Sequence, residues 1–130
     1  MSKYSSNNFI KSASFALRGL RLIIKSQKNF RRQLFFGIII LFFAALLRFN
    51  YIEFCITIIA IALVLLAEML NSVIEFTIDS YTKNKYSKLV EMAKDMAAGT
   101  VLTATIVSTI LGCILFGHKF VLLFVWLLSL

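Results

Sequence analysis

Proline is absent from the 130 residues of this sequence, and no Pro-, Gly- or Ser-rich stretch separates one part from another. No internal repeat is visible either. A second domain joined by a flexible linker is therefore not expected, and the length by itself predicts one domain.

Cysteine and histidine are also scarce, with two cysteines and one histidine in the whole sequence. Cys55 and Cys113 both lie inside apolar runs, and their spacing matches neither a metal site nor a disulfide framework. We interpret both as small buried hydrophobic residues. Residues 1–30 lack a compact apolar core followed by a small-residue cleavage site, so we expect no cleavable signal peptide.

Acidic residues number only 6, against 14 lysines and arginines, which gives a formal net charge of +8. An excess of this size could serve nucleic acid, but most of the basic residues lie beside apolar segments. Anionic lipid headgroups and an anionic substrate are therefore the expected partners, and nucleic acid is not.

Apolar residues, in contrast, make up 60% of the sequence. A soluble domain of this size cannot bury so much apolar surface, so the excess must face lipid. Three apolar segments predict membrane-spanning helices, at residues 30–47, 52–78 and 97–116. The first reaches the required length of roughly 20 residues only if Arg31 and Arg32 extend their charged ends to the membrane surface.

The segments that flank the spans differ in character. Residues 1–8 are polar, which predicts a disordered N-terminus. Between residues 9 and 28, apolar residues recur at three- and four-residue steps with basic residues between them, which predicts an amphipathic helix on the membrane surface. We expect residues 117–119 to interrupt the third span. Residues 120–130 then form an apolar C-terminal extension to a membrane domain over residues 9–119.

The distribution of basic residues predicts the orientation in the membrane. Eight lie before the uncharged part of the first span, including Arg31 and Arg32 at its start. Four lie in or beside the charged second loop at residues 81–91, and the polar break at residues 48–50 carries only Arg48. Because basic residues are retained on the cytoplasmic side, we expect the N-terminus and the second loop to be cytoplasmic.

An acidic stripe occupies the end of the second span. On a helix, Glu68, Asn71, Glu75 and Asp79 share one face, with Glu68 deepest among apolar neighbours. An ionisable group at membrane depth costs at least a few kcal/mol, which favours a functional role. The stripe could bind a divalent cation, or divide into a metal ligand and a general base. The simpler alternative is the polar face of a helix that emerges into water.

A second polar pair, Lys94 and Asp95, lies where the third span begins. A lysine can neutralise phosphate oxygens, and an aspartate can hold a magnesium ion that bridges phosphates. The alternative is an interfacial ion pair that marks the membrane edge. No Walker-type glycine loop or soluble-kinase signature is present, so a nucleotide would be held by metal, Lys94 and helix-end groups.

The pattern Glu68-x-x-Asn71-x-x-x-Glu75-x-x-x-Asp79, followed by Ala93-Lys94-Asp95, resembles the signature of the prokaryotic diacylglycerol kinase and undecaprenol kinase family. The likeness covers roughly residues 9–118. It implies an all-α membrane protein with three transmembrane helices plus an N-terminal amphipathic surface helix, assembled as a homotrimer in the bacterial inner membrane. It also implies phosphorylation of a lipid hydroxyl by ATP, with Mg²⁺ as cofactor.

The same resemblance implies roles for single residues. Glu68 would be the catalytic base. The nucleotide-binding residues would be Asn71, Glu75, Lys94 and Asp95, and Glu75 would also be a metal ligand. Gly19 and Arg21 would lie at the lipid interface.

Two positions depart from the family pattern. Gln27 stands at a metal-binding position where the family usually has glutamate, and it offers a neutral carbonyl oxygen in place of a charge. Ser87 stands where the second loop often has histidine. The first of these departures predicts weaker metal binding.

The expected reaction is phosphorylation of diacylglycerol to phosphatidic acid at the cytoplasmic interface, with undecaprenol as the alternative acceptor. A function of another class is a small non-catalytic membrane protein, holin-like or a scaffold, whose size and span count would be similar. The acidic stripe and the Lys94–Asp95 pair favour the kinase, because a pore former needs neither at fixed spacing.

Overall fold

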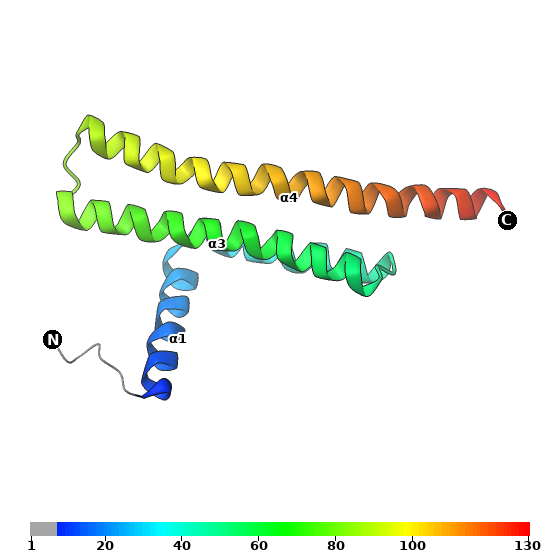
Figure 1. Cartoon of the computed structure of the whole chain (residues 1–130), viewed down its shortest axis with the longest axis horizontal. Coiled ribbons are helices and arrows are strands. Elements are labelled where there is room, and N and C mark those ends of the chain that lie inside the picture. Colours follow the sequence, from blue (N-terminus) through cyan, green and yellow to red (C-terminus); the bar gives the residue numbers. More distant parts are fainter. Residues whose placement is uncertain (1–7) are drawn as a thin grey trace.

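The computed structural model describes residues 8–130, and these residues form four α-helices without any strand (Figure 1). The helices are α1 (Phe9–Ser26), α2 (Lys28–Leu46), α3 (Tyr51–Thr82) and α4 (Lys88–Leu128). The predicted disordered segment lies outside the described residues except for Asn8, whose side chain accepts a hydrogen bond from the Ile10 amide and caps α1.

Three of these helices, α2, α3 and α4, are long and apolar enough to cross a membrane. In Figure 1, α3 and α4 run side by side, α2 packs on α3, and α1 leaves the bundle crosswise. None of the residues of α1 is buried against the rest of the chain. The predicted fold class, three membrane-spanning helices with an amphipathic N-terminal helix, is confirmed.

A single residue, Gln27, separates α1 from α2, and Arg31 stabilises this junction. The Arg31 guanidinium donates hydrogen bonds of 2.8 Å to the carbonyl oxygens of Ile24 and Lys25. These carbonyls belong to the last turn of α1, where no intrahelical donor is available. Arg31 therefore caps α1 and holds the crosswise angle.

Helices α2 and α3 approach closely at Gly37. A Cβ atom built on Gly37 would lie 2.7 Å from Cγ2 of Ile61, so a larger residue would have to displace the Ile61 side chain or move the helices apart. The two helices are joined by residues 47–50, where a polar break was predicted. Phe49 within this break is nevertheless buried, and its ring centroid lies 4.9 Å from that of Phe116.

Interactions at three heights fix the register of α3 against α4. Near one end, Lys94 forms an ion pair with Asp79 at 2.5 Å. In the middle, the Ser108 hydroxyl donates to the carbonyl oxygen of Ala60 at 2.8 Å. At the other end, Lys119 forms an ion pair with Glu53 at 3.0 Å. Neither helix can slide along the other without breaking all three.

Three sequence-based expectations were wrong. The second loop is shorter than residues 81–91, because α3 continues to Thr82 and Ser87 caps the start of α4. Residues 117–119 do not interrupt the third span, since an isolated glycine costs a helix only about 1 kcal/mol and Lys119 is paired. Cys55 and Cys113 are both exposed, not buried.

Candidate active site

Glu68 lies on the face of α3 that is buried inside the bundle, with only 5% of its surface exposed. Thr57, Ala60, Val64 and Ser72 share this face at helical spacing. The Ser72 hydroxyl donates to the backbone carbonyl of Glu68 at 2.8 Å, so it does not engage the carboxylate. Within residues 8–130 that carboxylate has no hydrogen-bond or ion-pair partner. A sheltered, unpaired carboxylate is free to accept a proton from a bound group.

One turn further along α3, Asn71 and Glu75 contact each other. The Asn71 amide nitrogen donates to Glu75 Oε1 at 3.4 Å, a long hydrogen bond. The Asn71 carbonyl oxygen is buried and is the one buried side-chain atom in the described residues that lacks a partner. A buried oxygen without a partner is expected to accept a hydrogen bond from a bound group or to coordinate a cation.

The donor set at Asn71 and Glu75 fits a magnesium ion. Magnesium prefers carboxylate and carbonyl oxygens, and commonly takes one or two protein ligands with the rest from water and substrate phosphates. No group of three or more His, Cys, Asp or Glu side chains in the described part of the chain could hold a metal by itself. The residues therefore suit a cation that is shared with a phosphate ligand.

Asp79 continues the stripe to the end of α3 and links it to α4. Its carboxylate pairs with the Lys94 ammonium at 2.5 Å, with the two side chains 40% and 37% exposed. Asp79 was on the predicted stripe but was not among the predicted site residues. Its position four residues after Glu75, on the same helix face, was the signal for its place in the site.

A polar cavity of about 280 Å³ lies beside this ion pair, between the ends of α3 and α4 and the loop that joins them. Asp79, Lys94 and Asp95 line it. Lys85 and Tyr86 also line it, and sequence reasoning had not assigned them a role. The two lysines suit phosphate oxygens, but the three carboxylates of Asp79, Glu91 and Asp95 outnumber them, so an anionic ligand at this cavity needs an accompanying cation.

Tyr86 is held over this cavity by a hydrogen bond from its hydroxyl to the Glu91 carboxylate at 2.5 Å. This bond raises the pKa of Tyr86, because the protonated phenol is needed as donor, and partial desolvation adds to the effect. The phenol therefore stays neutral through the physiological range.

The structure does not bring every predicted residue to this end of α3. Gly19 and Arg21 lie on α1, and Arg21 borders a shallow hollow on that helix. The Gln27 side chain donates to Ser26 Oγ at 3.5 Å, which leaves its carbonyl oxygen unengaged among the described residues. The metal-binding role of Gln27 stays a prediction.

The sequence matches the family described as prokaryotic diacylglycerol kinase over residues 14–116. The chain belongs to this family. Similar proteins include a diacylglycerol kinase of Synechocystis, 34% identical over 83% of this chain and 62% of the relative. An undecaprenol kinase of Bacillus subtilis is 33% identical over 87% of this chain and 91% of the relative. A diacylglycerol kinase of Escherichia coli is 33% identical over 85% and 90%.

These relatives confirm the resemblance that was inferred from the acidic stripe. Both names describe phosphotransferases that act on a lipid alcohol, which agrees with the predicted enzyme class. The three spanning helices and the prokaryotic diacylglycerol kinase family together identify a membrane protein. The chain spans 62% of the length of its Synechocystis relative and about nine-tenths of the other two.

Proposed function

We propose that this chain transfers the γ-phosphoryl group of ATP to the hydroxyl of a membrane lipid, with diacylglycerol as acceptor and phosphatidic acid as product. The observation that carries the proposal is the buried, unpaired carboxylate of Glu68, continued along α3 by Asn71, Glu75 and Asp79. A lipid in the bilayer reaches Glu68 from the apolar side. A water-soluble nucleotide reaches the other end of the stripe.

In this reaction Glu68 acts on the acceptor. A lipid hydroxyl is a poor nucleophile until a base accepts its proton. As the hydroxyl oxygen bonds to the γ-phosphorus, the bond from that phosphorus to the ADP oxygen breaks, and the hydroxyl proton passes to Glu68. Burial of Glu68 excludes the water that would otherwise compete as phosphoryl acceptor.

The nucleotide is held at the loop end of the stripe. Lys94 and Lys85 would face the phosphates from the polar cavity, and Asp95 lines the same cavity. Asn71 Oδ1 and Glu75 would hold the magnesium ion. When bound, that ion neutralises charge on the phosphate oxygens. Asp79 keeps Lys94 in position through their ion pair.

Location and assembly follow the family and the charge distribution. We place the chain in the bacterial inner membrane, with α1 and the loop between α3 and α4 on the cytoplasmic side, where ATP is available. The assembly we propose is a homotrimer, which would cover part of the apolar surface that a single chain leaves exposed. Native mass spectrometry should find three chains, and a stable monomer would contradict this.

Undecaprenol is the second candidate acceptor, because the Bacillus subtilis relative named undecaprenol kinase matches 87% of this chain. The test supplies the purified protein in vesicles with radiolabelled ATP and one lipid alcohol at a time. Label should enter diacylglycerol, whereas label in undecaprenol alone would select the second acceptor. Label in neither, together with leakage of vesicle contents, would favour the pore-forming alternative.

A further inference from the structure

Residues 120–128, at the end of α4, form an apolar helical segment that the rest of the chain leaves uncovered. The family match ends at residue 116, and Figure 1 shows this end of α4 extending past α2 and α3. All nine side chains of the segment are apolar and exposed. A helix that is apolar on every side is stable only where apolar material surrounds it. The surroundings of residues 120–128 must therefore come from outside the chain.

The apolar part of α4 is too long to lie entirely within the hydrocarbon of a bilayer. Residues 96–128 measure about 50 Å along the helix, against roughly 30 Å of hydrocarbon. One end must therefore lie among headgroups or in water. The inner end, residues 97–105, includes three threonines and one glycine, whereas residues 120–128 are apolar throughout. The outer end therefore gains more free energy from lipid than the inner end does.

The junction of α1 with α2 marks the inner edge of the hydrocarbon. Helix α1 is amphipathic, has no buried residue and leaves the bundle crosswise, as expected for a helix on a membrane surface. The Arg31 guanidinium is bound to carbonyl oxygens in the last turn of α1, so its charge stays level with that helix. Because Arg32 follows directly and the unbroken apolar run starts at Leu34, the hydrocarbon begins at about Gln33.

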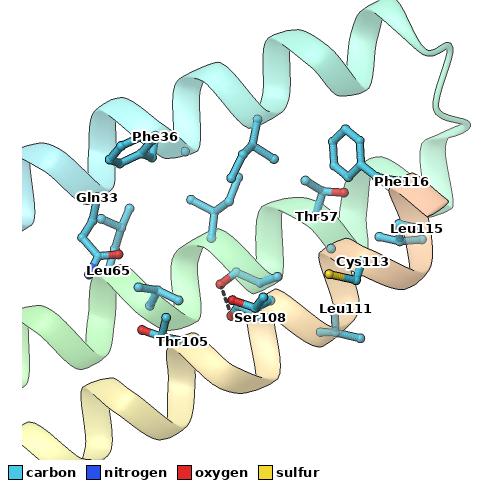
Figure 2. A pocket seen from close by; sticks show the side chains of 17 residues that line it. Gln33, Phe36, Thr57, Leu65, Thr105, Ser108, Leu111, Cys113, Leu115 and Phe116 are labelled. Atoms are coloured by element: carbon cyan, nitrogen blue, oxygen red, sulfur yellow. Dashed lines mark hydrogen bonds between the residues drawn. The ribbon is translucent and has the colours of Figure 1, made fainter. Parts of the chain in front are cut away.

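The packing of the bundle carries this level across to α4. Gln33 of α2, Leu65 of α3 and Thr105 of α4 lie at the same end of an apolar groove that they line (Figure 2). About 20 helical steps cross a hydrocarbon core of roughly 30 Å. Counted from Thr105, these steps reach Val125. The next residue, Trp126, then lies among the outer headgroups, where tryptophan is favoured.

The two ion pairs between α3 and α4 agree with this placement. On α3, Glu53 is 12 residues, or about 18 Å, from the inner edge, so the Glu53–Lys119 pair lies below the outer edge. Its side chains are 15% and 17% exposed, and Lys119 also donates to the carbonyl oxygen of Arg48. Charges at membrane depth are tolerated when they are paired in this way. The Asp79–Lys94 pair at the inner end is 40% and 37% exposed, as expected outside the hydrocarbon.

We propose that residues 120–128 anchor the chain in the outer leaflet, with residues 120–125 among acyl chains and Trp126 among the outer headgroups. Lipid is therefore the partner of this apolar surface. Movement of the chain toward the outside would transfer the segment from lipid to water, so the anchor opposes such movement. It thereby holds Glu68 close to the inner edge of the hydrocarbon and keeps the polar cavity outside it. This role is independent of the reaction at Glu68, and its tests report position instead of turnover.

The first experiment uses Trp126, the single tryptophan of the sequence, as a native probe of depth. The full chain is reconstituted in phosphatidylcholine vesicles that carry bromine atoms either near the headgroup or near the end of the acyl chains. The shallow bromines should quench Trp126 fluorescence several-fold more than the deep ones. Combining Trp126→Phe with Val121→Trp moves the probe about 7 Å deeper, so the preference should shift toward the deep bromines.

Iodide in the aqueous phase identifies the two results that would overturn the proposal. Efficient quenching of Trp126 by iodide, without quenching by either brominated lipid, would place the segment in water. Quenching by neither iodide nor lipid would show that a second copy of the chain, and not lipid, covers the segment.

A matched pair of aspartate substitutions tests the anchor itself. Val121→Asp introduces a charge below the outer edge of the hydrocarbon, on a side chain too short to reach the headgroups, so the segment should shift outward. Iodide should then quench Trp126 several-fold more than in the unchanged protein. Leu130→Asp lies beyond the outer edge and should leave iodide quenching as it was. Equal iodide quenching in the two variants would show that position 121 is not in hydrocarbon, and the proposal would be wrong.

Discussion

At the residue scale, Glu68 is the buried acidic side chain that has no hydrogen-bond or ion-pair partner within residues 8–130, whereas Asp95, which has none either, is exposed. Glu53, Asp79 and Glu91 each have an ion-pair partner, and Glu75 contacts Asn71. Placing a carboxylate among apolar side chains costs free energy that packing does not repay. A residue retained at such a cost is expected to contribute to binding or catalysis.

Replacing Glu68 with glutamine tests this role directly. Glu68→Gln keeps the shape of the side chain but removes the proton acceptor, so turnover should fall by about 10²-fold or more. The variant should keep the helix content and the assembly of the unchanged protein, measured by circular dichroism and size-exclusion chromatography. Near-normal turnover in the variant would remove Glu68 from the proton transfer.

Gln27 tests the proposed magnesium site. The affinity of an oxygen site for a divalent cation rises with the number of charged ligands. If Gln27 contributes to the same ion as Glu75, Gln27→Glu should lower the magnesium concentration needed for half-maximal rate. Rates measured across a magnesium titration give this value.

The control for that prediction is a double-mutant cycle with Glu75→Gln. The effect of Gln27→Glu should disappear in the Glu75→Gln background, because two ligands of one ion are not independent. A magnesium dependence that Gln27→Glu leaves unaltered would separate Gln27 from the metal site.

At the scale of the elements, the pairing of α3 with α4 positions the proposed site. Asp79 and Lys94 are 15 residues apart in the sequence, and Glu53 and Lys119 are at the opposite ends of the same two helices. The Glu53–Lys119 pair is well sheltered, with side-chain exposures of 15% and 17%. It therefore anchors the end of the bundle that is distant from the stripe, and it keeps Lys94 level with Asp79.

Charge removal at Glu53 should loosen this anchor. Glu53 also accepts a hydrogen bond from the Asn50 amide in the capping box of α3, and glutamine can serve that box equally well. Glu53→Gln should thus isolate the loss of the ion pair. A thermal denaturation in detergent, followed by circular dichroism, should show a lower midpoint.

The comparison variant is Lys119→Met. On its own it should also lower the midpoint, and the two changes together should cost less than the sum of the single effects. Strictly additive effects would show that Glu53 and Lys119 do not stabilise the protein through each other.

At the scale of the whole molecule, the charge distribution matches the proposed direction of the reaction. Basic residues are concentrated before the first span and around the loop between α3 and α4, where the polar cavity lies. Both regions must be cytoplasmic if the cavity is to receive ATP. The opposite end of α4 extends past α2 and α3 in Figure 1 as an exposed apolar helix.

Cysteine accessibility tests this orientation, in a background that lacks Cys55 and Cys113. Lys85→Cys should resist membrane-impermeant thiol reagents in intact cells and react after the cells are opened. Lys85 is preferable to Lys83 and Asn84, whose positive φ angles of 52° and 62° disfavour cysteine. Leu130→Cys lies at the other end of α4, so it should react with the same membrane-impermeant reagents in intact cells. Ready labelling of Lys85→Cys from outside would invert the topology.

Much of this protein was predictable from sequence, because the periodicities involved are local. The three spans followed from apolar runs, and the N-terminal helix followed from apolar residues that recur every three or four positions with basic residues between them. The acidic stripe followed from the rotation of about 100° per residue in a helix. The family followed from the same stripe, since its polar residues stand where apolar ones would be stable.

Tertiary structure alone decided which residues of different helices meet. The Lys94–Asp79 and Lys119–Glu53 pairs and the burial of Phe49 all depend on how the helices pack against one another. The continuity of α4 through residues 117–119 was missed for the same reason. From the sequence alone, an isolated polar segment predicts the end of a helix. Here Lys119 of that segment forms an ion pair with Glu53, which is 66 residues away in the chain and comes within reach only in the packed bundle.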